Sequence, residues 1–117
     1  MPSGERNVLP VLDRVAAVRS MGGDESMFET FIDLFIEDSA NQIAVMEDAI
    51  AEDDAERLER AAHSLKWAAA TMHAERIREV ADHLEMMGHD KAISDAGAVL
   101  TCLLDEFSAL KEYVKSL

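Results

Sequence analysis

The C-terminal stretch ISDAGAVLTCLLDEFSALKEYVKSL, residues 93–117, has the most regular hydrophobic pattern in the chain. Its apolar residues alternate between steps of three and four for seven steps, at Ile93, Ala96, Leu100, Leu103, Phe107, Leu110, Val114 and Leu117. This spacing places one apolar stripe along a helix and is typical of the seam between antiparallel helices of a bundle. A two-stranded coiled coil has the same spacing, so the rest of the chain must decide between the two folds.

Helical patterns also cover most of the chain before this stretch. The expected elements are a short helix over 9–20, a long helix after the N-cap Asp24, a histidine-containing helix from the acidic turn 52–54 to about Thr71, and a helix over 74–87 with Gly88 as its C-terminal stop. The apolar stripe of the long helix is expected at Phe28, Phe31/Ile32, Phe35, Ile43, Met46 and Ile50. Pro10 falls in the first turn of the short helix, where its missing N–H costs little.

Four amphipathic helices joined by short turns favour an intramolecular bundle over a coiled coil. The sequence therefore predicts an all-α fold, an antiparallel up-and-down four-helix bundle with a short additional N-terminal helix. A chain of 117 residues is large enough for one hydrophobic core and too small for two. We expect a single helical domain over residues 9–117, preceded by a flexible lead-in over residues 1–8.

Composition and charge exclude several classes of protein. The content of 49% hydrophobic and 30% charged residues is ordinary for a soluble globular domain. The formal net charge of −13 argues against nucleic acid or an anionic membrane as the main partner, because both would be repelled. With one cysteine, no intrachain disulfide can form, and no apolar run resembles a signal sequence or a membrane span. These features indicate a cytoplasmic protein.

The segment Ala62-His63-Ser64-Leu65-Lys66 has a pattern that suits phosphoryl chemistry. The buried stripe of its helix is expected at Leu58, Ala62, Leu65, Ala69 and Met72. His63 lies about 100° of helical rotation from that stripe, so solvent should reach its imidazole. An imidazole is partly neutral and nucleophilic near pH 7, and a lysine at i+3 can contact phosphoryl oxygens.

This segment resembles the core motif of histidine-containing phosphotransfer (HPt) domains. The resemblance extends to Gly22-Gly23-Asp24, to the long helix with Phe28, Phe31 and Phe35, and to the helix opening Ala74-Glu75-Arg76-Ile77. It implies a small helical bundle that accepts a phosphoryl group from the aspartate of a receiver domain and passes it to another receiver. The implied roles are phosphoacceptor for His63 and electrostatic support for Lys66.

The same resemblance sets expectations for partners and cofactors. The partner would be the receiver domain of a response regulator, of a hybrid sensor histidine kinase, or of both. Docking is expected around His63, at Arg60, Ser64, Trp67 and Ala70. We expect a monomer that binds no cofactor or metal, with Mg²⁺ on the partner receiver, and a phosphotransfer intermediate rather than an enzyme.

The distribution of charge supports this interpretation. Between Arg57 and Arg78 there are five basic and two acidic residues, a net charge of +3, whereas the rest of the chain has six basic and 22 acidic residues. One interpretation is a basic cluster around His63 that attracts a phosphoryl group and an acidic receiver pocket. The alternative is a solvated helix face.

Two departures from the family pattern keep other functions open. Trp67 stands where the family usually has glycine, four residues after the histidine, and His73 where it has a second glycine. An indole at i+4 leans over the residue it follows. It could therefore block the site and leave a non-transferring adaptor or inhibitor, or swing aside and anchor a partner. If the second glycine ends the helix in a left-handed conformation, histidine is tolerated there.

A third hypothesis is a metal-binding helical bundle. Three Glu/His pairs at i, i+4 lie on common helix faces, namely Glu59/His63, Glu79/His83 and Glu85/His89. No pair is supported by a matching carboxylate on the other long helices. Motifs for disulfide exchange, serine hydrolases and nucleotide-binding loops are absent from the sequence.

Overall fold

The computed structural model describes residues 9–117, and all of the regular secondary structure in this range is helical. The expected all-α fold is confirmed. Its elements are α1 (Arg14–Ser20), α2 (Glu25–Ala51), α3 (Ala55–Met72), α4 (Glu75–His89), the 3₁₀ turn η2 (Ile93–Asp95) and α5 (Ala96–Lys115). None of the helices within 9–117 is both long enough and apolar enough to cross a bilayer.

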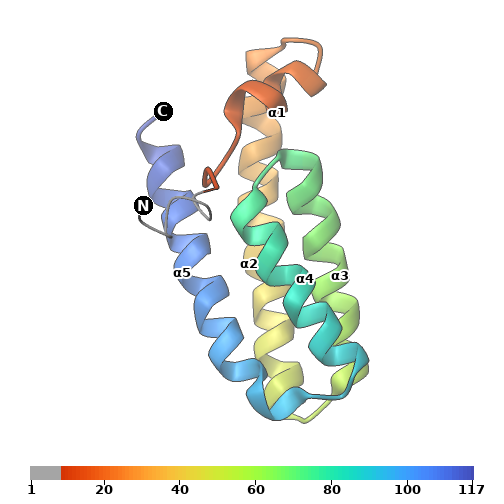
Figure 1. Cartoon of the computed structure of the whole chain (residues 1–117). Coiled ribbons are helices and arrows are strands. Elements are labelled where there is room, and N and C mark those ends of the chain that lie inside the picture. The colour runs from red at the N-terminus through yellow and green to blue at the C-terminus, as the bar shows by residue number, and fades with distance from the viewer. Residues whose placement is uncertain (1–8) are drawn as a thin grey trace, which may run out of the picture.

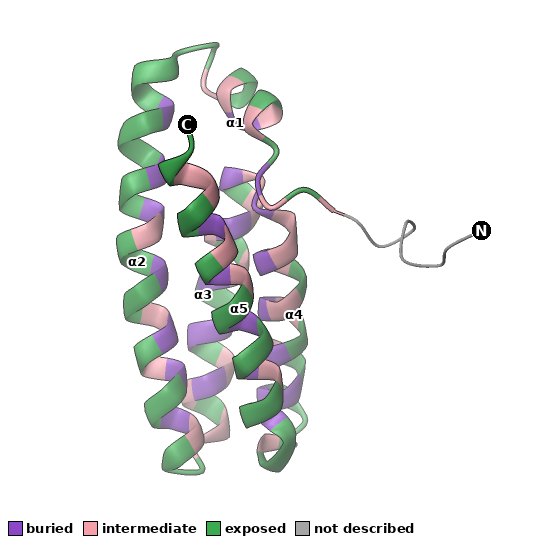
Figure 2. Cartoon of the chain, turned by 90° about the vertical axis from the view of Figure 1, so that its left-hand side faces the viewer, coloured by how far each residue is buried: buried purple, intermediate pink, exposed green. Residues whose placement is uncertain are grey.

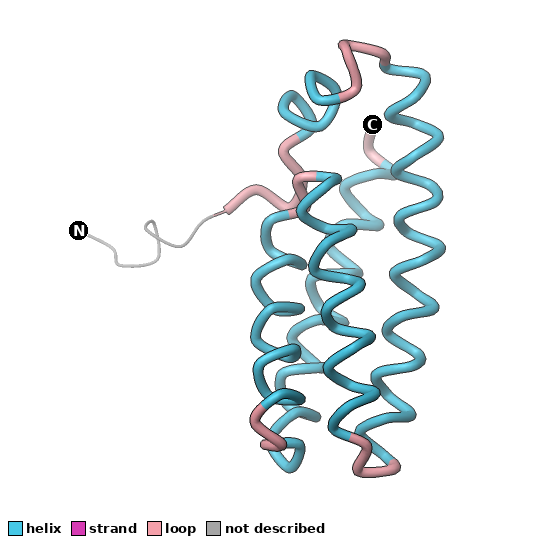
Figure 3. The backbone as a smooth tube through the Cα atoms, turned by 90° about the vertical axis from the view of Figure 1, so that its right-hand side faces the viewer, coloured by secondary structure: helices cyan, strands magenta, loops and turns pink. Residues whose placement is uncertain are grey.

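The four long helices lie side by side along the length of the molecule (Figure 1). The turns that connect them lie at the two ends of the bundle, so each long helix reverses the direction of the one before it (Figure 3). Helix α3 packs most extensively against α4 and next against α2, and α5 closes the bundle against α4 and α2. The α3–α4 seam is therefore the largest interface in the fold.

Buried residues follow the inner faces of the long helices (Figure 2). The predicted seam of α5 is confirmed in its centre, at Ala96, Leu100, Leu103, Phe107 and Leu110, whereas Leu117 is exposed beyond the helix end. On α2 the core contains Phe28, Ile32 and Phe35, and Phe31 is exposed rather than part of the core.

The first helix is shorter than the sequence pattern predicted, because it begins at Arg14 rather than at residue 9. The Asp13 carboxylate accepts a hydrogen bond from the Ala16 N–H and caps α1, so Pro10 lies before the helix. The Asp13 N–H donates to the carbonyl of His73 at 3.0 Å, which fixes this segment to the turn between α3 and α4. The expected lead-in over residues 1–8 lies outside the described residues.

Helix α3 ends as the sequence predicts, whereas α4 ends later than predicted. His73 ends α3 in the left-handed conformation with φ of 59°, as expected for the family glycine position. Gly88 is not the stop of α4, because the helix continues to His89 and Lys91 takes the left-handed position instead. Gly88 is buried where the two helices touch, and a Cβ there would lie 2.7 Å from the backbone nitrogen of Glu59 and 2.8 Å from the carbonyl oxygen of Ala55.

The glycine at position 88 thus sets how closely α4 approaches α3. We expect Gly88→Ala to lower the free energy of unfolding by about 1–3 kcal/mol, because the added methyl group meets backbone atoms that cannot rotate away. Gly97, in the first turn of α5, has no atom within 4 Å of its Cβ position and is the matched control. Gly97→Ala should stabilise the protein by up to about 1 kcal/mol through helix propensity. Urea unfolding followed by circular dichroism measures both, and equal effects of the two substitutions would contradict the role of Gly88.

Candidate functional site

His63 lies on the outer face of α3, and its side chain is 51% exposed. Its Nδ1 atom lies 2.7 Å from Oε2 of Glu85, which extends from α4 across the seam. A carboxylate can only accept a hydrogen bond, so this contact requires the hydrogen of the imidazole on Nδ1. In the neutral ring the lone pair is then on Nε2, the nitrogen that Glu85 does not hold.

Lys66 belongs to the same contact network. Its Nζ lies 2.6 Å from Oε1 of Glu85 and 3.4 Å from Oδ1 of Asp82, and its side chain is 26% exposed. Contact with Glu85, supported by Asp82, raises the pKa of Lys66. Burial alone would raise the pKa of Glu85, but the contacts with Lys66 and His63 outweigh it and lower the pKa below its ordinary value. The Glu85 carboxylate is therefore ionised at neutral pH, with Oε2 against His63 and Oε1 in an ion pair with Lys66.

The expected basic cluster around His63 does not form. All five basic residues between Arg57 and Arg78 lie near a carboxylate, in the pairs Arg57–Glu52, Arg60–Glu56, Lys66–Glu85, Arg76–Glu106 and Arg78–Glu75. The count along the chain omitted Asp82 and Glu85, which α4 places beside the site. The loosest of these pairs is Arg60–Glu56, with 3.9 Å between Nη1 and Oε1.

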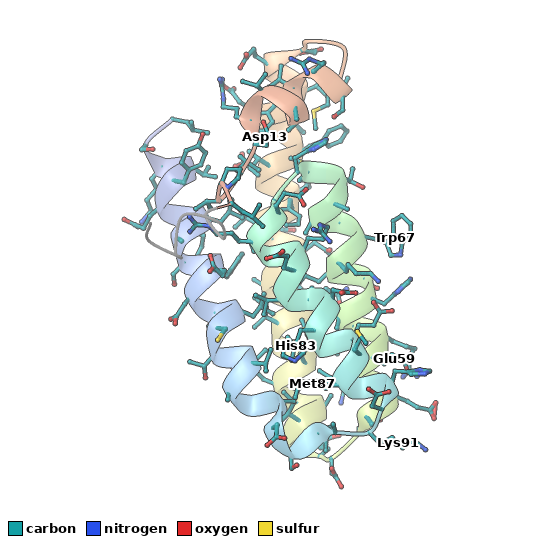
Figure 4. All side chains as sticks on the ribbon, in the orientation of Figure 1. Asp13, Glu59, Trp67, His83, Met87 and Lys91 are labelled. Carbon is teal, nitrogen blue, oxygen red and sulfur yellow. The ribbon has the colours of Figure 1, made fainter. Side chains whose placement is uncertain are left out.

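Trp67 does not cover His63. Its side chain points away from the bundle (Figure 4), and the residue is 62% exposed. The two ring centroids are 6.1 Å apart with an angle of 66° between the ring planes, an edge contact rather than a stack over the imidazole. The structure thus favours the arrangement in which the indole leaves the imidazole open.

The other predicted docking residues surround the same surface. Arg60 and Ser64 are exposed and line an open hollow of about 430 Å³ together with His63. Ala70 is half-buried and lines a neighbouring hollow with Lys66 and Trp67. The predicted site residues therefore come together on one face of α3.

Sequence reasoning missed one part of this site and one exposed surface near it. The first is the contact of His63 with Glu85 of α4. Glu85 lies 22 residues beyond His63 on the next amphipathic helix, and this position was the only signal for the contact in the sequence. The second is an exposed apolar stripe on α2, formed by Met27, Phe31 and Leu34. With Ala68 of α3 this stripe lines a hollow of about 530 Å³, the other residues of which are Ser20, Met21, Phe35, Asp38, Thr71 and Met72. Its spacing of four and three could have shown a second apolar face on α2.

Two of the three i, i+4 pairs that suggested a metal site are replaced by pairs between helices. His63 contacts Glu85, and Nδ1 of His89 lies 3.2 Å from Oε2 of Glu59. Among residues 9–117 no three His, Cys, Asp or Glu side chains gather in a way that could hold a metal ion.

Comparisons with known proteins agree with this geometry. A search of curated proteins finds no match. The fold is similar to that in the crystal structure of histidine-containing phosphotransfer protein B (HptB) from Pseudomonas aeruginosa PAO1, with a TM-score of 0.85 and 23% sequence identity over 93% of this chain and 95% of that chain. The family model described as the Hpt domain matches residues 30–113. The all-helical bundle with His63 on its surface therefore belongs to the Hpt domain family.

Proposed function

We propose that this protein carries a phosphoryl group on His63 between receiver domains of a two-component phosphorelay. The observation that supports this role most directly is the contact of Nδ1 with Glu85, which leaves Nε2 as the nucleophile on a half-exposed ring. Family membership supports the general function in a phosphorelay. The direction of transfer and the identity of the receivers belong to the proposal.

The transfer step follows from this arrangement. The Nε2 lone pair attacks the phosphorus of a receiver's aspartyl phosphate, a P–N bond forms, and the P–O bond to the aspartate breaks with its electron pair on the carboxylate. Nδ1 keeps its hydrogen, and the ionised Glu85 stabilises the positive charge that develops on the imidazole. Transfer to a second receiver is the reverse of this step. Mg²⁺ would be held by the receiver, so the protein acts as a carrier rather than a catalyst.

The receiver would dock over the face that α2 and α3 share beside His63. A contiguous exposed apolar patch on a solvated helix is unusual, and here Met27, Phe31 and Leu34 of α2 line one hollow with Ala68 of α3, the residue after Trp67. An apolar patch flanked by polar residues is typical of a protein interface. We propose a monomer that docks one receiver at a time in the cytoplasm.

The first prediction from this proposal concerns the phosphorylated atom. Incubation with a receiver domain, acetyl phosphate and Mg²⁺ should place an acid-labile, alkali-stable phosphoryl group on the protein. We expect His63→Gln to abolish this label. His89→Gln is the matched control, because His89 also has its Nδ1 against a carboxylate of the neighbouring helix, and it should keep full labelling. Full labelling of His63→Gln would show that the site is wrong.

The role of Glu85 gives a second prediction. Glu85→Ala should slow labelling by roughly tenfold, the value of one hydrogen bond to a charged group. Glu85→Gln should recover only part of the rate, since an amide oxygen still accepts from Nδ1 but has no charge to stabilise the imidazolium. The ¹⁵N chemical shifts of the imidazole report which nitrogen carries the hydrogen and should change in Glu85→Ala alone. Glu106→Ala removes a carboxylate that pairs with Arg76 outside the hollow of His63, and it should leave both measurements unchanged.

The same carboxylate makes stability depend on pH. Because the pKa of Glu85 is lower in the folded protein, its ionised form stabilises the fold above the ordinary carboxylate range. That contribution is lost as the pH falls through the lowered pKa. The stability advantage of the wild type over Glu85→Gln should therefore shrink on acidification, as measured by urea unfolding at each pH. A pH-independent difference would contradict the ionised pair.

Trp67 gives a third prediction. If the exposed indole anchors the receiver, Trp67→Ala should weaken binding by about 2 kcal/mol, as for an aromatic residue at the centre of an interface. Labelling should slow with it. Met86→Ala is the matched control, because Met86 is equally apolar and exposed but lies on α4. Calorimetry with the receiver measures both. Faster labelling of Trp67→Ala would instead identify an indole that blocks transfer and would support the adaptor function.

A further inference from the structure

A phosphoryl group on Nε2 of His63 would bring about two negative charges to a surface that already holds carboxylates. Glu59 and Glu85 line the same hollow as His63. Phosphoryl oxygens need cationic or hydroxyl donors, so the residues that supply them can be sought among the side chains around this hollow.

Lys66 is poorly placed for this task. Its ammonium is paired with Glu85 at 2.6 Å and with Asp82 at 3.4 Å, so two carboxylates already compensate its charge. A phosphoryl group would have to compete with both carboxylates for this ammonium, and one of them is the residue that holds Nδ1 of His63. In this structure Lys66 contacts the imidazole only through Glu85.

Arg60 has the freedom that Lys66 lacks. It lies three residues before His63, on the same helix face, and its side chain is 71% exposed. Its one ion pair, with Glu56, has 3.9 Å between the charged atoms and joins two exposed side chains, so little holds the guanidinium in place. A guanidinium also has a planar set of donors that matches phosphoryl oxygens.

The hollow beside the imidazole brings a second donor to the same place. It is lined by Glu59, Arg60, His63, Ser64 and Glu85. The hydroxyl of Ser64 and the guanidinium of Arg60 therefore lie beside the same hollow as the imidazole. Ser64 is exposed and directly follows His63 in the helix. A hydroxyl can donate one hydrogen bond to a phosphoryl oxygen.

We propose that Arg60 and Ser64 bind the phosphoryl oxygens of phosphorylated His63, and that Lys66 is a positioning residue that acts through Glu85. This inference rests on the proposed function, because it requires His63 to accept the phosphoryl group. It assigns the binding of the phosphoryl oxygens to Arg60 and Ser64 rather than to Lys66, the lysine of the motif.

Phosphoramidate tests this assignment without a receiver, so docking does not enter the measurement. The lone pair of Nε2 attacks phosphorus, a new P–N bond forms, and ammonia leaves. We expect Arg60→Ala to slow this labelling by about tenfold and Arg60→Lys to recover part of the rate. Ser64→Ala should cause a smaller loss. Arg57→Ala is the matched control, because it removes the same charge one turn earlier on α3 from a residue outside the hollow of His63.

Magnetic resonance separates the two roles. Arg60→Ala should change the ³¹P shift of the phosphohistidine and leave the imidazole ¹⁵N shifts of the unphosphorylated protein unchanged. Lys66→Ala should do the opposite, because it releases Glu85 from its second partner. Circular dichroism confirms the fold of each variant.

The outcomes distinguish the inference from the proposed function. A labelled wild type in which Arg60→Ala matches Arg57→Ala, while Lys66→Ala changes the ³¹P shift, overturns the inference alone. A wild type that no donor labels on His63, whether phosphoramidate or a phosphorylated receiver, overturns both.

Discussion

The contact between His63 and Glu85 across the α3–α4 seam is the interaction on which the rest of the site depends. It joins two helices through 2.7 Å between Nδ1 and Oε2, so it depends on the register and spacing of α4 against α3. Gly88, one turn beyond Glu85 on α4, permits that approach because any side chain there would meet the backbone of α3. Fold and chemistry are thus linked through a residue that has no functional group of its own.

The same contact explains how an acidic protein can present a nucleophilic histidine. The ionised Glu85 is shared between the imidazole and Lys66, so it stabilises both groups instead of repelling an incoming phosphoryl group at full strength. The charge of Lys66 is already compensated by this pairing. Among the basic residues near His63 in the described range 9–117, the cation with most freedom to move toward Nε2 is Arg60, whose pair with Glu56 is long and exposed. Electrostatics at this site therefore depends on which charges are already paired, and a count of charges along the chain does not report that.

Trp67 shows how a departure from the family pattern is accommodated. A bulky ring four residues after the histidine would fill the space above it if it leaned along the helix. Instead the ring points outward and touches the imidazole only by its edge. On α2, the apolar stripe of Met27, Phe31 and Leu34 also stays exposed. Trp67 thus leaves apolar surface exposed beside His63, and the stripe leaves more of it exposed beside Ala68, the residue after Trp67 on α3.

Much of the fold could be predicted from local pattern. The seam of α5, the capping by Asp24 and the left-handed His73 all follow from spacing or backbone preference within a few residues, and the structure confirms them. The predicted start of α1 was wrong because Pro10 was taken as part of the first turn, although Asp13 is a local N-cap of the same kind as Asp24. The predicted end of α4 was wrong because the packing of Gly88 against α3 is a contact that a periodic pattern does not record. Phe31 was assigned to the core because adjacent positions on a helix can share a stripe, and the packing of the bundle decided that Ile32 is buried and Phe31 exposed.

The sequence by itself determined that His63 is a surface residue of an amphipathic helix, with Arg60, Ser64 and Trp67 around it, since helical rotation alone places them there. Only the tertiary structure decided which groups His63 and Lys66 contact. Their partners Glu85 and Asp82 are 22 and 16 residues away in the chain, on a helix whose orientation depends on packing. A carboxylate at that separation becomes a neighbour only when two helices pack in a particular register, and no local rule specifies that register.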